Sequence, residues 1–291
     1  MIHTPIDLWI LVRESIYEWI DDRASRKGAA LAFYTVFSLA PILIMAIAIA
    51  GFFFGEEAAR GEIFAQVRDL LGPDGAQAVQ AMIQNASRPG ASATATIVGI
   101  VTLFIGATTA LAELKDGLDQ IWDVPTERMS GFWYFVRKRL LSIGVIGSLG
   151  FLLLVSLVFS AVVTAVAKRW SPSTATGTLL QSANLVFAFV LVTLLFAMIY
   201  KILPSVKIAW RDVIIGSVVT ALLFSIGKFA IGLYLGNSAI GSTYGAAGSV
   251  ILVLVWVYYS AQIFLLGAEF TKVYAHRYGS LRELAKLEST D

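Results

Sequence analysis

Residues 245–268 of the chain read GAAGSVILVLVWVYYSAQIFLLGA. This stretch contains no Asp, Glu, Lys or Arg, and most of its side chains are apolar. A helix of about 20 residues rises about 30 Å, which is the thickness of the hydrocarbon layer of a membrane. The stretch is therefore predicted to cross a lipid bilayer as one helix.

Five more runs of this kind lie earlier in the chain, at about residues 29–54, 94–112, 140–167, 182–200 and 213–235. Only the last of these is interrupted by a charge, that of Lys228. Hydrophobic residues make up 57% of the 291 residues and charged residues 14%, against roughly 25% charged in soluble domains. The sequence predicts an all-α membrane protein, a bundle of six transmembrane helices.

The Lys and Arg residues are divided unequally between the two sides of this predicted bundle. Sixteen of the 22 lie in the amino-terminal arm, the second and fourth connections and the tail, whereas five lie in the first and third connections. Lys228, inside a predicted span, is the remaining one. Because cytoplasmic loops carry the excess of Lys and Arg, both termini are predicted to be cytoplasmic.

Three segments outside the spans complete the predicted organisation. Residues 1–28 form a cytoplasmic arm, in which residues 6–20 have acids along one helical face and apolar side chains around the other. This pattern is typical of a helix that lies on a membrane surface. The first outer connection, 55–93, is long enough for two amphipathic helices separated by Gly72 and Pro73. The membrane domain then covers 29–275, and 276–291 is a cytoplasmic tail.

Several catalytic and structural chemistries have little support in the composition. The chain has no Cys, so disulfides, thiolate nucleophiles and cysteine metal sites are excluded. Only His3 and His276 supply imidazoles, and neither lies near a carboxylate group with metal-ligand spacing. We therefore expect no catalytic residue and no metal site.

Four stretches of the chain resemble the YihY/BrkB family of bacterial inner-membrane proteins. They are RASRKGAALAFYTVFSLAP (23–41), GATTALAELKDGLDQIWDVP (106–125), YKILPSVKIAWRDVIIGSVVTALLF (200–224) and GKFAIGLYLGNSAIGSTYGAAGSVILVLVWVYYSAQIFLLGAEFTKVYA (227–275). The resemblance implies six spans, a bacterial inner membrane and no cofactor. Members were formerly labelled ribonucleases, and others have been linked to virulence or transport. The family supplies no catalytic residues to assign here.

A charged residue within a span is the first candidate for function. A Lys at the centre of a bilayer costs about 2.5–3.5 kcal/mol on insertion scales, so such residues usually face protein or a wet cavity. If Lys228 does not face protein or a cavity, its side chain would extend along the helix and place the ammonium group at the outer membrane interface. A path for a polar headgroup would combine it with uncharged polar residues of the last two spans and their hairpin, namely Gln262, Asn237, Ser242, Thr243 and Tyr244. The alternative for the hairpin is close helix packing through small residues.

Charged residues at the cytoplasmic ends of the spans form two further candidate groups. A charge network is predicted from Glu113, Lys115, Asp116, Arg26 and Glu269. A metal or acid/base site is the alternative for Glu113 and Asp116, which share a helical face with Gln120 and Asp123, but a juxtamembrane network is favoured because no His is near these residues. The basic residues that flank spans are candidate contacts for anionic lipids; they are Arg23, Arg26, Lys27, Arg137, Lys138 and Arg139.

Three functions are compatible with these residues. The favoured function is that of a transporter or flippase-like protein that handles a lipid or another amphiphile, because polar residues within spans are energetically costly and usually serve a function. A non-enzymatic envelope scaffold, which would bind envelope proteins through its outer insert, is the alternative. A ribonuclease is the weakest, because the sequence lacks an evident general base, acid or metal site for RNA cleavage. Membrane lipids are the expected partners, and no nucleic acid is expected.

Overall fold

The computed structural model describes residues 5–86, 109–124, 174–237 and 246–282. Within these ranges the chain forms helices and turns and no strand, which confirms the all-helical class. A short helical stretch covers residues 109–121. The longer helices are α1 (Pro5–Asp21), α2 (Ala24–Phe54), α3 (Glu56–Ala86), α6 (Thr174–Ile202), α7 (Trp210–Asn237) and α9 (Ala246–Arg277).

Three helices of the described part are long and apolar enough to cross a membrane. Their apolar segments are Leu185–Ile202 in α6, Trp210–Ile231 in α7 and Val250–Arg277 in α9. They overlap the predicted spans at 182–200, 213–235 and 245–268. Helix α2 contains the predicted span at 29–54. The predicted span at 140–167, and most of that at 94–112, lie outside the described residues.

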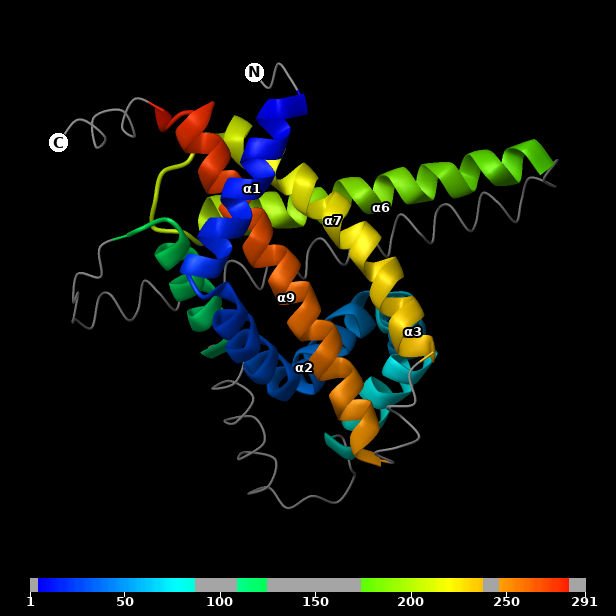
Figure 1. Ribbon diagram of the computed structural model, residues 1–291. Coiled ribbons are helices and arrows are strands. Elements are labelled where there is room, and N and C mark those ends of the chain that lie inside the picture. The colour runs from blue at the N-terminus through cyan, green and yellow to red at the C-terminus, as the bar shows by residue number, and fades with distance from the viewer. Residues whose placement is uncertain (1–4, 87–108, 125–173, 238–245, 283–291) are drawn as a thin grey trace.

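Helix α9 is the centre of the described bundle, with α1, α2, α3 and α7 packed around it (Figure 1). The start of α1 and the end of α9 lie at the same end of the molecule. Helix α6 packs on α7 through its second half, where Phe196 and Tyr200 are buried. Because α1 begins where α9 ends, the described parts of both chain ends lie on one side of the bundle.

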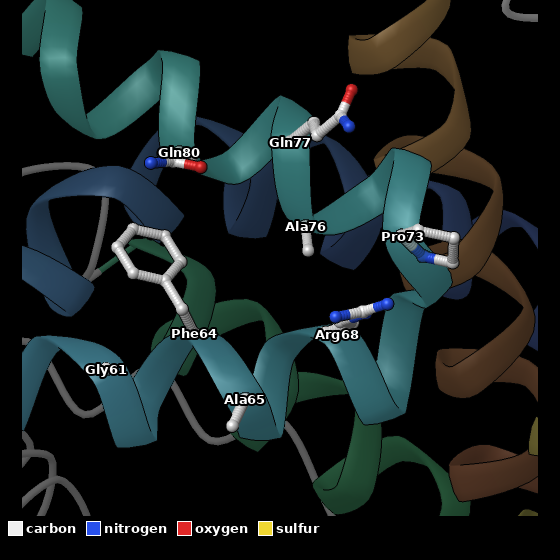
Figure 2. Close-up of a pocket in the computed structure, with 8 residues that line it drawn as sticks. All are labelled: Gly61, Phe64, Ala65, Arg68, Pro73, Ala76, Gln77 and Gln80. Carbon is white, nitrogen blue, oxygen red and sulfur yellow. The ribbon is translucent and has the colours of Figure 1, made fainter.

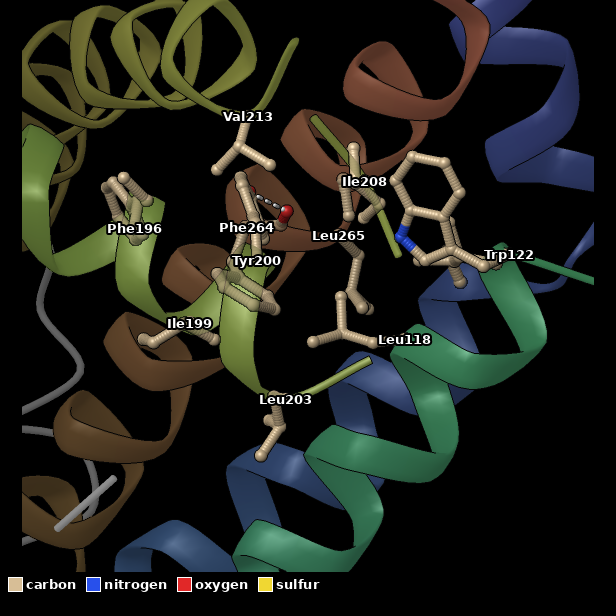
Figure 3. Packing of buried hydrophobic residues seen from close by; sticks show 14 of the residues in the cluster. Leu118, Trp122, Phe196, Ile199, Tyr200, Leu203, Ile208, Val213, Phe264 and Leu265 are labelled. Carbon is tan, nitrogen blue, oxygen red and sulfur yellow. Dashed lines mark hydrogen bonds between the residues drawn. The ribbon is translucent and has the colours of Figure 1, made fainter. Parts of the chain in front are cut away.

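Close packing of α6, α7 and α9 depends on small residues where the helices meet. A Cβ atom added to Gly267 would lie 2.0 Å from Thr220 Oγ1 and 2.7 Å from the Tyr200 hydroxyl. The Tyr200 hydroxyl donates a hydrogen bond to the Phe264 carbonyl oxygen at 2.7 Å (Figure 3). Apolar side chains surround this bond, so a side chain larger than that of glycine would not fit at residue 267.

Helix α3 is bent rather than continuous. Gly72 has φ 77° and ψ 177°, outside the helical region, and Pro73 follows it. The break falls at the place where the sequence predicted a separation of two amphipathic helices. Val79 and Ile83 of the second part pack against Ala32 and the rest of a buried apolar cluster on α2 and α9.

Helix α1 turns its acidic face towards the protein and much of its apolar face outward. Glu14 pairs with Arg277, and Glu18 pairs with Lys272 at 3.1 Å, so α1 runs antiparallel to the end of α9. Trp9 and Tyr17 are 66% and 61% exposed. Because exposed aromatic side chains favour the membrane interface, this face is suited to lie on lipid headgroups.

Since the chain has no Cys, a probe can be placed on this face through a single introduced thiol. We expect a spin label on Trp9→Cys, in protein reconstituted in lipid, to be accessible to oxygen and shielded from a water-soluble nickel complex. A label on Arg282→Cys, an exposed position beyond α9, is the control and should show the reverse. Equal accessibility to the nickel complex at both positions would contradict an interfacial α1.

Candidate functional site

Polar side chains form a line along one face of α9 (Ala246–Arg277). Gln262 and Glu269 are seven residues apart, so they share a face and are separated by about 10 Å along the axis. Lys272 continues the line towards the end of the helix. These residues face the α1–α2 turn and the start of α2, and we call them, together with Asp22 and Lys27, the polar seam.

The deepest member of the polar seam is Gln262. Its Nε2 lies 3.5 Å from the Ser25 carbonyl oxygen, towards which it donates. Gly28 makes room for the amide, because a Cβ there would lie 2.0 Å from Nε2. The other end of the amide, Oε1, is buried and accepts no hydrogen bond from the described residues. Gln262 therefore places a desolvated, half-satisfied amide between two helices.

Glu269 occupies the middle of the polar seam and is 0% exposed. Within the described part of the chain, neither of its carboxylate oxygens accepts a hydrogen bond, and the same holds for Asp22 Oδ2. Lys27 Nζ is buried without an acceptor among those residues. Asp22, Lys27 and Glu269 are close enough for electrostatic interaction. Burial lowers the pKa of Lys27, and the neighbouring Asp22 and Glu269 carboxylates oppose that shift.

Lys272 lies at the end of the polar seam farthest from Gln262, and its ammonium group pairs with two acids. Its Nζ lies 2.6 Å from Asp123 Oδ2 and 3.1 Å from Glu18 Oε2. Asp123 reaches this position because it adopts a left-handed conformation, with φ 50°, after the helical stretch 109–121. The Val124 amide then donates to the Asp119 carbonyl at 2.9 Å, which is the pattern of a helix-ending Schellman motif.

A second polar cluster joins the helical stretch 109–121 to the turn after α6. Lys115 pairs with Asp119 and donates to Ser205 Oγ at 2.6 Å. The Ser205 amide and hydroxyl both donate to Asp119, at 2.6 Å and 3.0 Å. This cluster fixes the turn between α6 and α7 against the helical stretch.

The residues of the predicted charge network are therefore divided between two places. Lys115 belongs to the cluster with Asp119 and Ser205, whereas Glu269 belongs to the polar seam with Lys27. Asp116 and Arg26 are exposed, and Glu113 is half-buried. Whether these residues act together in the membrane protein stays a prediction.

Two residues of the predicted translocation path, Lys228 and Gln262, lie at similar depths on different helices. Lys228 is half-buried on α7, next to Gly227, whose closest neighbours are Tyr259 and Ile263 of α9. Gln262 lies at the same level on the side of α9 that faces α2. Asn237 ends α7, and the predicted path residues Ser242, Thr243 and Tyr244 lie outside the described residues.

The basic residues predicted to contact lipid point in different directions at the start of α2. Arg23 and Arg26 are exposed, and Arg23 adopts a left-handed conformation with φ 51° in the turn between α1 and α2. Lys27 instead places its Nζ inside the polar seam. The other three predicted contacts, Arg137, Lys138 and Arg139, lie outside the described residues.

An open groove lies in the bend of α3 (Figure 2). Arg68 is the charged side chain in its lining. None of the predicted site residues lines it. The lining comes from both parts of the bent helix and consists of Gly61, Phe64, Ala65, Arg68, Pro73, Ala76, Gln77 and Gln80. In the described ranges no three or more His, Cys, Asp or Glu side chains group in a way that could hold a metal ion.

Sequence reasoning missed Asp22, Asp119 and Asp212 as structural partners. Asp212 is buried and accepts hydrogen bonds from the amide and hydroxyl of Ser280, both at 2.7 Å. An acid directly before a predicted span was an available signal, because such a group needs a donor or the helix N-terminus. Asp22 was marked by its place directly before a basic, span-flanking segment.

Comparison with known proteins gives a consistent family. A profile of the family described as virulence factor BrkB matches residues 15–290. A UPF0761 membrane protein of Stenotrophomonas maltophilia (strain K279a) is 26% identical over 254 residues, which is 87% of this chain and 58% of the relative. A UPF0761 membrane protein of Cronobacter sakazakii is 26% identical over 287 residues, covering 97% of this chain and 91% of the relative.

A third relative is the UPF0761 membrane protein YihY of Shigella sonnei. It is 29% identical over 197 residues, which is 67% of this chain and 64% of the relative. The chain spans less than two thirds of the length of several of these relatives, 58% in the S. maltophilia protein. No solved structure is significantly similar to the chain.

Proposed function

The chain belongs to the BrkB family of membrane proteins, and we propose that it is a transporter or flippase-like protein that handles a lipid or another amphiphile. The polar seam is the observation that carries the proposal. It sets Gln262, Glu269 and Lys27 between packed helices, with polar atoms that the described residues leave unpaired.

Unpaired polar atoms between helices are costly when the helices serve only to pack. A buried polar group without a hydrogen bond destabilises a protein by about 1–3 kcal/mol, and an unpaired charge by more. Leu or Met at residues 262 and 269 would avoid that loss. A static scaffold has no use for these groups, whereas a protein that binds protons, ions or headgroups between its helices does.

The topology proposed for this function is six spans in a bacterial inner membrane, with both ends cytoplasmic. The unequal distribution of Lys and Arg supports this orientation. The position of the start of α1 and the end of α9 on one side of the bundle supports an even number of spans (Figure 1). Exposed Arg23 and Arg26 would then face anionic lipid headgroups, each contributing about 1 kcal/mol near the surface.

The proposal is tested by replacing Lys228, in the second half of α7. In a strain that lacks the gene and shows an envelope defect, Lys228→Met is expected to abolish complementation while changing stability by less than about 0.5 kcal/mol. Lys207→Met, at an exposed loop position, is the matched control and should complement fully. Full complementation by Lys228→Met would exclude a role of this residue in a path, and reduced stability would indicate a buried partner instead.

An envelope scaffold is the second candidate, and the groove of α3 favours it. This groove would be the docking surface for an envelope protein if α3 lies on the outer side (Figure 2). A scaffold requires α3 and tolerates changes in the bundle interior. The two functions therefore differ in the outcome for Lys228→Met, which a scaffold would survive.

A further inference from the structure

We infer that Glu269 and Asp22 hold one shared proton next to Lys27, so that the polar seam contains a proton-binding site. This inference goes beyond the proposed function, because it depends on no particular substrate. It rests on the charges, the burial and the unpaired atoms of three side chains contributed by the α1–α2 turn, α2 and α9.

The charges of the polar seam do not balance when every group is ionised. Lys272 is already engaged by Glu18 and Asp123. Counted together with Lys272 and its partners, the group has four carboxylates, those of Glu18, Asp22, Asp123 and Glu269, against the two ammonium groups of Lys27 and Lys272. Two excess negative charges remain when every group is ionised, and such a charge is strongly unfavourable at Glu269, which is 0% exposed. Loss of the Lys27 proton would increase the excess, so the missing proton belongs on a carboxyl group.

The unpaired atoms lead to the same conclusion independently of charge. In the described part of the chain, Asp22 Oδ2, Gln262 Oε1 and both Glu269 oxygens are buried acceptors without a donor, beside Lys27 Nζ as an unused nitrogen donor. Ionised carboxylates only accept, whereas a protonated carboxyl also donates. A proton on Glu269 or Asp22 therefore allows one carboxyl to donate to the other, which removes two unpaired acceptors at once.

A proton bound at this position would be able to exchange with one side of the membrane. Lys272, at one end of the polar seam, contacts Glu18 and Asp123, whose side chains are 47% and 69% exposed. The opposite end of the polar seam, at Gln262, lies between packed helices. Any movement that separates α9 from the start of α2 would expose Glu269, and the proton would then be released.

The inference is tested on the full-length protein in detergent, through infrared absorption and thermal unfolding at several pH values. The wild-type protein is expected to show the absorption of a protonated carboxyl group at neutral pH, and Glu269→Gln to lose it. Because the folded state would bind one proton more than the unfolded state, the Tm of the wild type should fall as the pH rises. Glu269→Gln, which imitates the neutral acid, should keep the wild-type Tm at neutral pH and lose most of that fall.

Two further variants make the result decisive. Glu57→Gln, at an exposed position of α3, should leave the absorption and the pH dependence unchanged. Asp22→Asn should change the same absorption band, because it removes the second carboxyl of the pair. The inference is overturned if Glu269→Gln keeps the band, or if it fails to fold or has a clearly lower Tm at neutral pH. It is also overturned if sodium chloride, compared with choline chloride, stabilises the wild type but not Glu269→Gln, because the occupant would then be a cation.

Discussion

Lys272→Met is expected to lower the free energy of unfolding by about 2–3 kcal/mol, the range for charge-assisted hydrogen bonds that are lost on one side. Lys272 is buried and holds Asp123 at 2.6 Å and Glu18 at 3.1 Å. Its loss also removes a cation near Glu269, which is 0% exposed. The value lies below that for fully buried ion pairs, because water can reach Asp123 and Glu18 after the substitution.

Arg277→Met is the matched control for this effect. Arg277 pairs with Glu14 on the same two helices, α1 and α9, but both side chains are partly exposed. An exposed ion pair is worth up to about 1 kcal/mol, so this variant should be close to wild type. Equal losses of stability in chemical unfolding of the two variants would show that Lys272 has no special position.

Gly267→Ala is expected to lower the stability by about 2–3 kcal/mol, although it adds only one methyl group. The added Cβ would lie 2.0 Å from Thr220 Oγ1, so α7 and α9 would have to move apart. That movement would also disturb the hydrogen bond from Tyr200 to the Phe264 carbonyl. The effect is measured as a shift of the unfolding transition in detergent. We expect α6 and α7 to melt once the added methyl group has weakened the packing of α7 on α9.

The control for Gly267→Ala is Gly61→Ala in α3, where nothing lies within 4 Å of the added atom. Alanine is the better helix former by about 1 kcal/mol, so this variant should be neutral or slightly more stable. If both variants behaved alike, the close packing of α7 on α9 would be refuted.

The helices could be predicted from the sequence because each apolar run carries its own signal. The runs at 182–200, 213–235 and 245–268 became α6, α7 and α9, and Gly72 with Pro73 marked the bend of α3. The two faces of α1 could also be assigned, because they depend only on helical periodicity. These features are local, so one chain segment contains all the information that they need.

The polar seam could not be predicted in the same way, because it depends on how helices are rotated against one another. The sequence identified Gln262 and Glu269 as polar groups in or beside a span. It did not show that Gly28 brings α2 close to Gln262, or that Lys27 rather than a neighbouring Arg would turn inward. Contacts such as that between Lys272 and Glu18 join residues far apart in the chain.

The proposed movement of an amphiphile across the membrane can be measured in vitro. Its most direct test uses purified full-length protein in lipid vesicles that contain a phospholipid with a fluorescent headgroup. A quencher that cannot cross the membrane is added outside. We expect quenching to extend to label from the inner leaflet in vesicles with wild-type protein, and much less so in vesicles with Lys228→Met. The proposed transport would be contradicted if quenching stayed restricted to the outer leaflet, as in protein-free vesicles, for both neutral and anionic headgroups.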